Sequence, residues 1–193
     1  GGGWVLRSTR WGKAGRGGNL APLYTVEQAR RSLGRLRAVG LDEMVELGHS
    51  VRCRFRNAGH ILGSAIIEID VEESGHTRRL VVSGDLGQPM RPVLQDPVQI
   101  PSADYLCVES TYGNRAHRSF ADTCEELAEA LRRTLKVNGG NVIIPAFAVG
   151  RTQELLIVLA DLVRTGRIDR LYVVVDSPMA SAVTELTVRH GAH

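Results

Sequence analysis

The hydrophobic residues of this chain change their spacing near residue 110, and that change constrains the fold more than any other feature. Within 51–56, apolar residues alternate one by one with arginines. Such alternation is typical of a strand with one solvated face. Segments 65–71 and 78–82 are also strand-like, and Gly75 lies between them. We therefore expect a β-hairpin over 65–82.

After residue 110, helical patterns alternate with short, fully apolar segments. Ser177 followed by Pro178 is a strong helix start, since serine caps the first turn and proline fits its first position. The expected elements are strands over 105–108, 142–144 and 171–175, and helices around 124–135, over 152–163 and from Ser177 onward. Apolar strands that alternate with helices predict a parallel sheet covered on both faces, so the fold class is α/β.

The beginning of the chain is expected to differ from the rest. Residues 1–22 are rich in glycine and arginine and can bury little surface, so we expect a flexible segment. A basic arm that contacts nucleic acid is the less favoured alternative. Thr25 and Gln28 have the spacing of a capping box, which predicts a helix that begins there and ends at Gly40.

Composition excludes some classes of protein and leaves others open. The formal net charge of +3 is too small to establish a nucleic-acid partner, although 22 of the 24 basic residues are arginines. The longest apolar run, 142–149, is far shorter than the about 20 residues of a bilayer span, so we expect no membrane partner. We expect no secretion signal. The three cysteines have apolar neighbours and no CxxC spacing, which predicts buried free thiols in a reducing cytoplasm.

Three glycine-containing motifs place a polar residue where a strand or hairpin ends. They are AGHILGSA with His60, SGDLG with Asp85 and ESTYG with Glu109. An imidazole and two carboxylates at neighbouring strand ends could share one cleft, and His and Asp are common zinc ligands. From the residues alone, each has an ordinary alternative: a hydrogen-bonded structural histidine, an aspartate that caps a turn, and a surface glutamate.

These motifs, followed by IPAFAVGRTQELL and VDSPMA, resemble the β-CASP branch of the metallo-β-lactamase fold. The family contains RNA-processing nucleases. The resemblance extends from about Leu23 to the C-terminus. It implies part of a metallo-β-lactamase αββα sandwich over 23–113 and the first part of a parallel-sheet β-CASP domain over 114–193.

The resemblance also implies a site. His60 would bind one zinc ion, Asp85 would bridge two Zn²⁺ ions, and Glu109 would lie beside them and orient a histidine near the leaving group. Asp85 and Glu109 are thus the expected catalytic residues, and a metal-bound hydroxide would hydrolyse RNA. DNA stays open as a substrate. Arg151 begins a helix and is expected either to contact the RNA backbone or to form a structural salt bridge.

The chain departs from the family pattern in its histidines. It has no HxHxDH cluster and no counterpart of the two later β-CASP histidines. We therefore expect the middle of a longer protein, inactive by itself. Half a sandwich leaves an apolar sheet face uncovered, which favours self-association into a homo-oligomer or poor solubility. The alternatives are a non-catalytic RNA-binding or scaffold member of the family and a small-molecule hydrolase of the wider fold.

Overall fold

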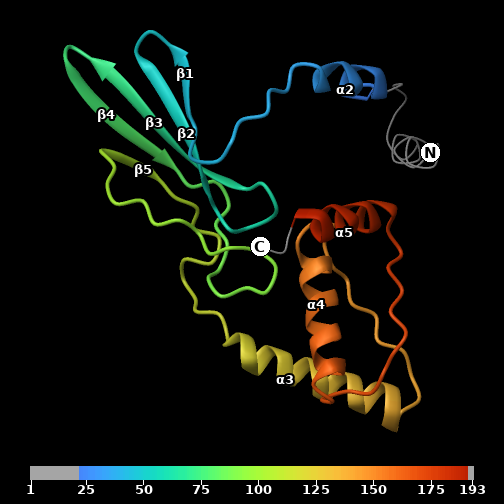
Figure 1. Cartoon of the computed structure of the whole chain (residues 1–193). Coiled ribbons are helices and arrows are strands. Elements are labelled where there is room, and N and C mark those ends of the chain that lie inside the picture. Colours follow the sequence, from blue (N-terminus) through green and yellow to red (C-terminus); the bar gives the residue numbers. More distant parts are fainter. Residues whose placement is uncertain (1–21, 191–193) are drawn as a thin grey trace, which may run out of the picture. The chain divides into compact units, whose positions relative to one another are not determined.

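The computed structural model describes residues 22–190 and divides the chain into two units between residues 39 and 40 (Figure 1). The predicted flexible segment lies outside the described residues, apart from residue 22. In its described residues, 22–39, the first unit contains helix α2 (Val26–Leu33). The capping box is confirmed, because Thr25 Oγ1 accepts the Gln28 N–H at 3.2 Å and Gln28 Oε1 accepts the Thr25 N–H at 2.8 Å. The predicted end at Gly40 is wrong.

Helix α2 ends at Gly34, whose N–H bonds to the Arg31 carbonyl at 3.3 Å. No residue of α2 is buried, and Leu33 and Leu36 are both largely exposed. A short helix gains most of its stability from tertiary packing of its apolar side. Without that packing, nothing extends α2 beyond the first glycine.

The second unit begins with a five-stranded sheet in the order β1-β2-β3-β4-β5. Its strands are β1 (Met44–Gly48), β2 (Val51–Asn57), β3 (Ala65–Glu73), β4 (His76–Val82) and β5 (Tyr105–Cys107). Neighbouring strands are antiparallel except β4 and β5, which are parallel. The hairpin predicted over 65–82 is confirmed, and its turn residues Ser74 and Gly75 both have positive φ. The strand predicted over 105–108 is β5.

One face of this sheet carries a ladder of ion pairs. The β-sheet register aligns Arg52 with Asp70, and Asp70 with Arg79. Arg79 donates Nε to Asp70 Oδ1 at 2.7 Å and Nη2 to Oδ2 at 3.0 Å, a bidentate pair. Asp70 and Glu68 are both buried. The arginine face of β2, predicted to be solvated, is therefore half-buried against carboxylates.

Helices dominate the rest of the second unit. They are α3 (Phe120–Leu131), continued by the π-helix η1 (Arg132–Val137), then α4 (Arg151–Arg164) and α5 (Pro178–His190). The predicted helices are confirmed, and Ser177 Oγ accepts the Ala180 N–H at 3.2 Å as the expected cap. The buried core of this helical part consists of Ala128, Leu131, Val158, Leu159, Leu162 and Ile168.

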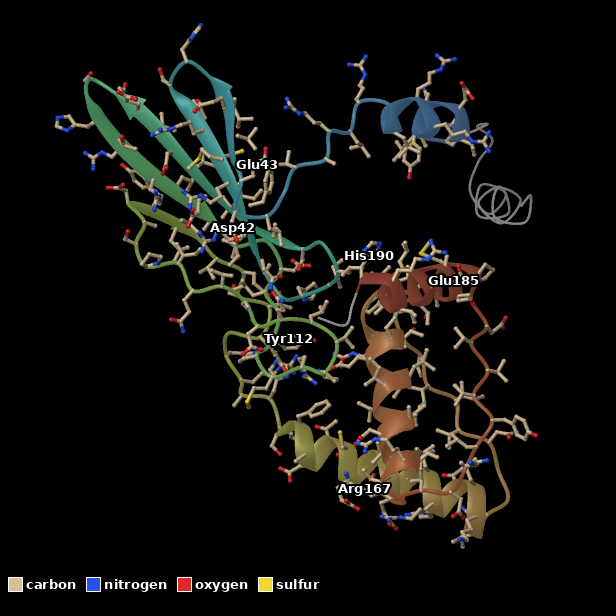
Figure 2. All side chains as sticks on the ribbon, viewed as in Figure 1. Asp42, Glu43, Tyr112, Arg167, Glu185 and His190 are labelled. Carbon is tan, nitrogen blue, oxygen red and sulfur yellow. The ribbon has the colours of Figure 1, made fainter. Side chains whose placement is uncertain are left out.

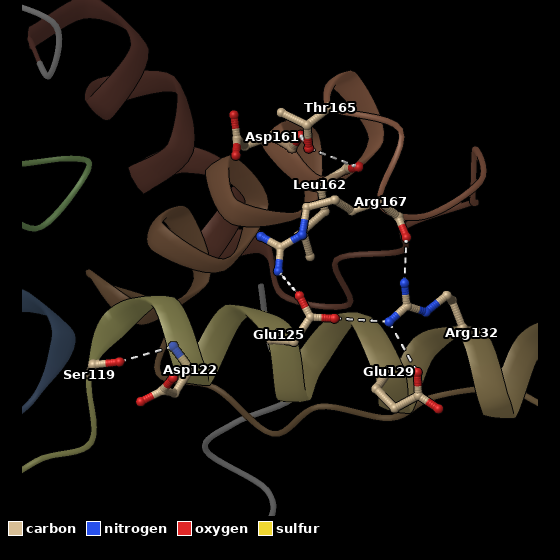
Figure 3. Close-up of polar contacts among 9 residues, drawn as sticks. All are labelled: Ser119, Asp122, Glu125, Glu129, Arg132, Asp161, Leu162, Thr165 and Arg167. Atoms are coloured by element: carbon tan, nitrogen blue, oxygen red, sulfur yellow. Dashed lines mark hydrogen bonds and ion pairs between the residues drawn. The ribbon is translucent and has the colours of Figure 1, made fainter.

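A polar cluster fastens α3 to the loop after α4 (Figure 3). The Glu125 carboxylate accepts hydrogen bonds from Arg132, at 3.0 Å, and from Arg167. Arg132 Nη1 also donates to the Arg167 carbonyl at 3.2 Å. The two segments that flank the core are thus joined by charged groups at its edge.

The strands predicted over 142–144 and 171–175 are wrong. Within residues 22–190, every strand lies before residue 108. Val142 and Leu171 pack against the helical core, but Ile143 and Tyr172 are at least nine-tenths exposed. A parallel strand needs a hydrogen-bonded partner from a distant part of the sequence, and no described segment pairs with these two. The described part of the chain is mixed α/β, without the second sheet.

The structure also bears on the expectations about membrane-spanning helices and about the cysteines. None of the described helices combines the length and apolar character that crossing a membrane requires. All three cysteines are free, and Cys53 is buried. Cys107 is exposed, contrary to the prediction, because it ends the short edge strand β5.

Candidate active site

The turn that carries His60 begins where β2 ends and is held by side-chain hydrogen bonds. Ser64 Oγ accepts the N–H of His60 at 3.0 Å and that of Ile61 at 3.2 Å. Asn57 Oδ1 accepts the Gly59 N–H at 3.0 Å, and Gly59 has a φ of 62°. Serine and asparagine commonly stabilise turns in this way. Three side-chain hydrogen bonds and the positive φ of Gly59 therefore fix the backbone from which the imidazole projects.

The turn that carries Asp85 packs directly on the His60 turn. The Gly87 N–H donates to the Ala58 carbonyl at 2.8 Å. A Cβ atom added at Gly87 would lie 1.7 Å from the carbonyl oxygen of Gly59, so only glycine allows this contact. The approach brings His60 Nε2 to 3.7 Å from Asp85 Oδ2. Both side chains are accessible to solvent, with exposed fractions of 42% and 79%.

Glu109 joins the third motif to the same place. Its Oε1 accepts the Leu86 N–H at 3.0 Å, and its Oε2 accepts the Thr111 N–H at 3.3 Å. The hydrogen bond from Leu86, then those from Thr111, and to a lesser degree the nearby His60, hold the pKa of this carboxyl below its usual value. Glu109 is therefore ionised at neutral pH and fastens the Asp85 turn to the end of β5.

Ser83 makes a second link between these two motifs. Its hydroxyl accepts the Glu109 N–H at 3.0 Å and donates to the Gly84 carbonyl at 2.6 Å. Ser83 is buried. The structure thus brings together His60, Asp85 and Glu109, the three residues selected from the sequence. The role of Glu109 toward a histidine stays a prediction.

Arg151 lies at the first position of α4, next to the His60 turn. A Cβ atom added at Gly150 would meet Ile61 Cγ2 at 2.9 Å, so the helix begins against that turn. Arg151 Nη1 pairs with Glu154 Oε2 at 2.8 Å, and Arg91 Nη1 pairs with the other oxygen at 2.9 Å. The structural salt bridge predicted for Arg151 is present. Its contact with RNA stays a prediction.

Sequence reasoning missed the residues that hold the turns. Asn57, Ser64 and Ser83 contact backbone groups of the motif residues, and the Asn57 amide also donates to the carbonyls of Gln95 and Asp96. Each lies within two residues of a glycine in a motif. Asn and Ser beside glycine signal a turn that uses its own side chains, and that signal could have identified them.

The donor set at this site fits part of a zinc centre. Two ligands bonded to zinc at about 2.0–2.1 Å in tetrahedral geometry lie roughly 3.4 Å apart, close to the separation of His60 Nε2 and Asp85 Oδ2. Between residues 22 and 190 there is no group of three or more His, Cys, Asp or Glu side chains placed to hold a metal ion. Within these residues, His60 and Asp85 make an incomplete set.

Comparison with known proteins decides the family. No family model matches the sequence. The chain is 42% identical to ribonuclease TTHA0252 of Thermus thermophilus over 168 residues, which are 87% of this chain and 37% of that protein. It is 31% identical to an RNase J-like protein of Methanocaldococcus jannaschii over 167 residues, 85% of this chain and 38% of that protein. The chain belongs to the β-CASP family.

A further β-CASP relative is the transcription termination factor FttA of Methanothermobacter thermautotrophicus, 33% identical over 171 residues, or 86% of this chain and 26% of that protein. The chain thus spans about a quarter to two-fifths of the length of these relatives. β-CASP membership confirms the resemblance drawn from the motifs of His60, Asp85 and Glu109.

Proposed function

We propose that this chain is the part of a zinc-dependent β-CASP ribonuclease that supplies two of its metal ligands. The observation that carries the proposal is the 3.7 Å approach of His60 Nε2 to Asp85 Oδ2, in the turns that follow β2 and β4. Relatives named as ribonucleases support the choice of RNA as the substrate. The finer fold follows the same family: part of an αββα sandwich, then part of a β-CASP domain.

In this proposal, His60 Nε2 and the Asp85 carboxylate hold zinc. Asp85 is the more exposed of the two, and its second carboxylate oxygen would be available to another ion. Bound zinc supplies Lewis acidity and an activated water at neutral pH. Glu109 positions the Asp85 turn through the Leu86 N–H, and Ser83 ties that turn to β5. The chain's own residues thus fix the ligands before the metal arrives.

Replacing Asp85 tests this function in the complete protein, in which this chain is joined to the remaining length of its relatives. Asp85→Ala should reduce the cleavage rate of single-stranded RNA at least ~100-fold, because it removes a metal ligand. RNA affinity should stay within about twofold, since the carboxylate does not attract phosphate. Cleavage is followed on gels and affinity by fluorescence anisotropy.

The matched control is Asp169→Ala, which removes an exposed carboxylate paired with Lys136. It should leave both quantities unchanged. Cleavage at the wild-type rate by Asp85→Ala contradicts the proposal. A parallel loss of cleavage and affinity, together with an altered circular dichroism spectrum, shows misfolding in place of a lost ligand. The 193-residue chain alone should not cleave RNA.

A further inference from the structure

The loop between β5 and α3 gathers aromatic and cationic side chains on the surface, directly after Glu109. Figure 2 labels Tyr112 on this loop. The guanidinium carbon of Arg115 lies 4.5 Å from the centroid of the Tyr112 ring, and the His117 ring lies 5.0 Å away at 69°. Tyr112 is half-exposed, and Arg115 and His117 are exposed. Three flat side chains are thus grouped where solvent reaches them.

Backbone hydrogen bonds hold this loop beside the candidate active site. The Gly113 N–H donates to the Ser110 carbonyl at 3.0 Å, and the Arg115 N–H donates to the Tyr112 carbonyl at 3.2 Å. Thr111 donates to the Glu109 carboxylate. Tyr112 is the third residue after Glu109, so their Cα atoms are at most about 11 Å apart. The loop therefore stays close to Glu109, the third residue of the candidate active site.

Arg115 differs from the arginines around it in its electrostatic environment. Among residues 22–190, it forms no ion pair with an acidic side chain. Arg118, three residues later, pairs with Glu126 at 2.7 Å. Unpaired guanidinium N–H groups suit phosphate oxygens, and the plane of the group also stacks on aromatic faces. Arg115 therefore combines an uncompensated charge with a position over the tyrosine ring.

We propose that Tyr112, Arg115 and His117 form a stacking site for one unpaired base of single-stranded RNA, with Arg115 also contacting the adjacent phosphate. The inference rests on the proposed function for the identity of the polymer. Proteins that bind single strands combine aromatic rings for the bases with arginines for the backbone. The site would hold the strand next to the His60–Asp85 pair.

The test compares RNA binding by variants of the 193-residue chain. The probes are a fluorescent ten-nucleotide oligouridylate and an abasic oligomer with the same number of phosphates, both in EDTA so that no cleavage is needed. Tyr112→Ala should weaken oligouridylate binding roughly 5- to 150-fold. Binding of the abasic oligomer should not change, because it offers no base to stack. Tyr112→Phe keeps the ring and should bind oligouridylate within about twofold of the wild type.

Arg115→Ala tests the phosphate contact. The slope of log affinity against log salt concentration should fall by about 0.7, the value for one phosphate of a single strand. The control Arg118→Ala should leave it unchanged. If Tyr112→Ala binds oligouridylate with wild-type affinity, or loses equal affinity for both oligomers, the stacking site is wrong. That outcome leaves the proposed ribonuclease function unaffected. Failure of the wild-type chain to bind either oligomer contradicts both this inference and RNA as the substrate.

Discussion

The sheet and the helical part of the second unit differ in how their backbone groups are hydrogen-bonded. Strands β1 to β4 pair with their sequence neighbours in antiparallel register, with one irregularity between Glu46 and Gly48, and β5 adds a parallel edge. After residue 110, helices α3 and α4 bury a compact core. The extended segments 142–144 and 171–175 beside that core have no strand partner in the described residues.

The difference shows which backbone hydrogen bonds can form between segments that are close together in the sequence. An antiparallel hairpin closes through a short turn, so the partner of its first strand is the next segment of the sequence. A parallel pair needs a crossover and a partner from a distant segment. Ile143 and Tyr172 project apolar side chains into solvent for this reason. The sheet is the more self-sufficient region, and the candidate active site is built on its strand ends.

The largest expected effect is on the helical core. Leu162 is 1% exposed, so Leu162→Ala should lower the free energy of unfolding by about 2–5 kcal/mol. Hydrogen exchange should show lost protection in α3 and α4 and little change in β2 to β4. Ile157→Ala, on the partly exposed side of α4, should cost no more than about half as much. If the sheet loses as much protection from hydrogen exchange as the helices do, the two regions are not stabilised separately.

A smaller effect is expected where the sheet supports the site. Gly87→Ala places a methyl group within 1.7 Å of the Gly59 carbonyl oxygen. The two turns must separate, and the free energy of unfolding measured in urea should fall by about 1–3 kcal/mol. Gly48→Ala is the control, because a Cβ atom there meets nothing within 4 Å. If both variants unfold at the same urea concentration, the Gly59–Gly87 contact is not what holds the turns together.

A third effect, similar in size to that of Gly87→Ala, depends on pH and again distinguishes the two regions. The buried acidic side chains among residues 22–190, Glu68 and Asp70, both lie in the sheet. Hydrogen bonds from Arg79 lower the pKa of Asp70 below its ordinary value. Its stabilising contribution is therefore present above the unfolded pKa of about 3.9 and is lost as pH falls through the lower folded value.

Asp70→Asn should accordingly cost about 1–3 kcal/mol at pH 7 and flatten the loss of stability below pH 4. Urea unfolding at several pH values, followed by circular dichroism, measures both. Glu73→Gln, which changes an exposed acid on the same strand, should retain the wild-type pH profile. An unchanged acid profile in Asp70→Asn would assign the pH dependence to other groups.

Local patterns in the sequence predicted the helices, strands and turns that are stabilised by contacts between residues close together in the chain. The alternation within 51–56, Gly75 in the hairpin turn and the Thr25–Gln28 capping box all correspond to observed structure. The predicted strands after residue 110 failed because apolar character indicates burial but supplies no hydrogen-bonding partner. The ion-pair ladder was also missed, since the alternation showed arginines without showing that Glu68 and Asp70 lie opposite them.

The same contrast holds for the candidate site. Motifs pointed to His60, Asp85 and Glu109, and the structure places them together. The contacts that achieve this placement, such as Gly87 against Gly59 and Glu109 to the Leu86 N–H, join segments more than 20 residues apart. Spacing along the chain carries no information about such contacts. The turn-forming roles of Ser64 and Asn57 are local and could have been predicted.

Anomalous diffraction at the zinc edge, from crystals of the complete protein grown with zinc, would show directly whether His60 and Asp85 bind the metal. We expect a zinc peak about 2.0–2.2 Å from both His60 Nε2 and a carboxylate oxygen of Asp85. That peak should disappear in the His60→Ala, Asp85→Ala double variant. Zinc bound only elsewhere, with neither side chain within bonding distance, would contradict the assignment of this pair as metal ligands.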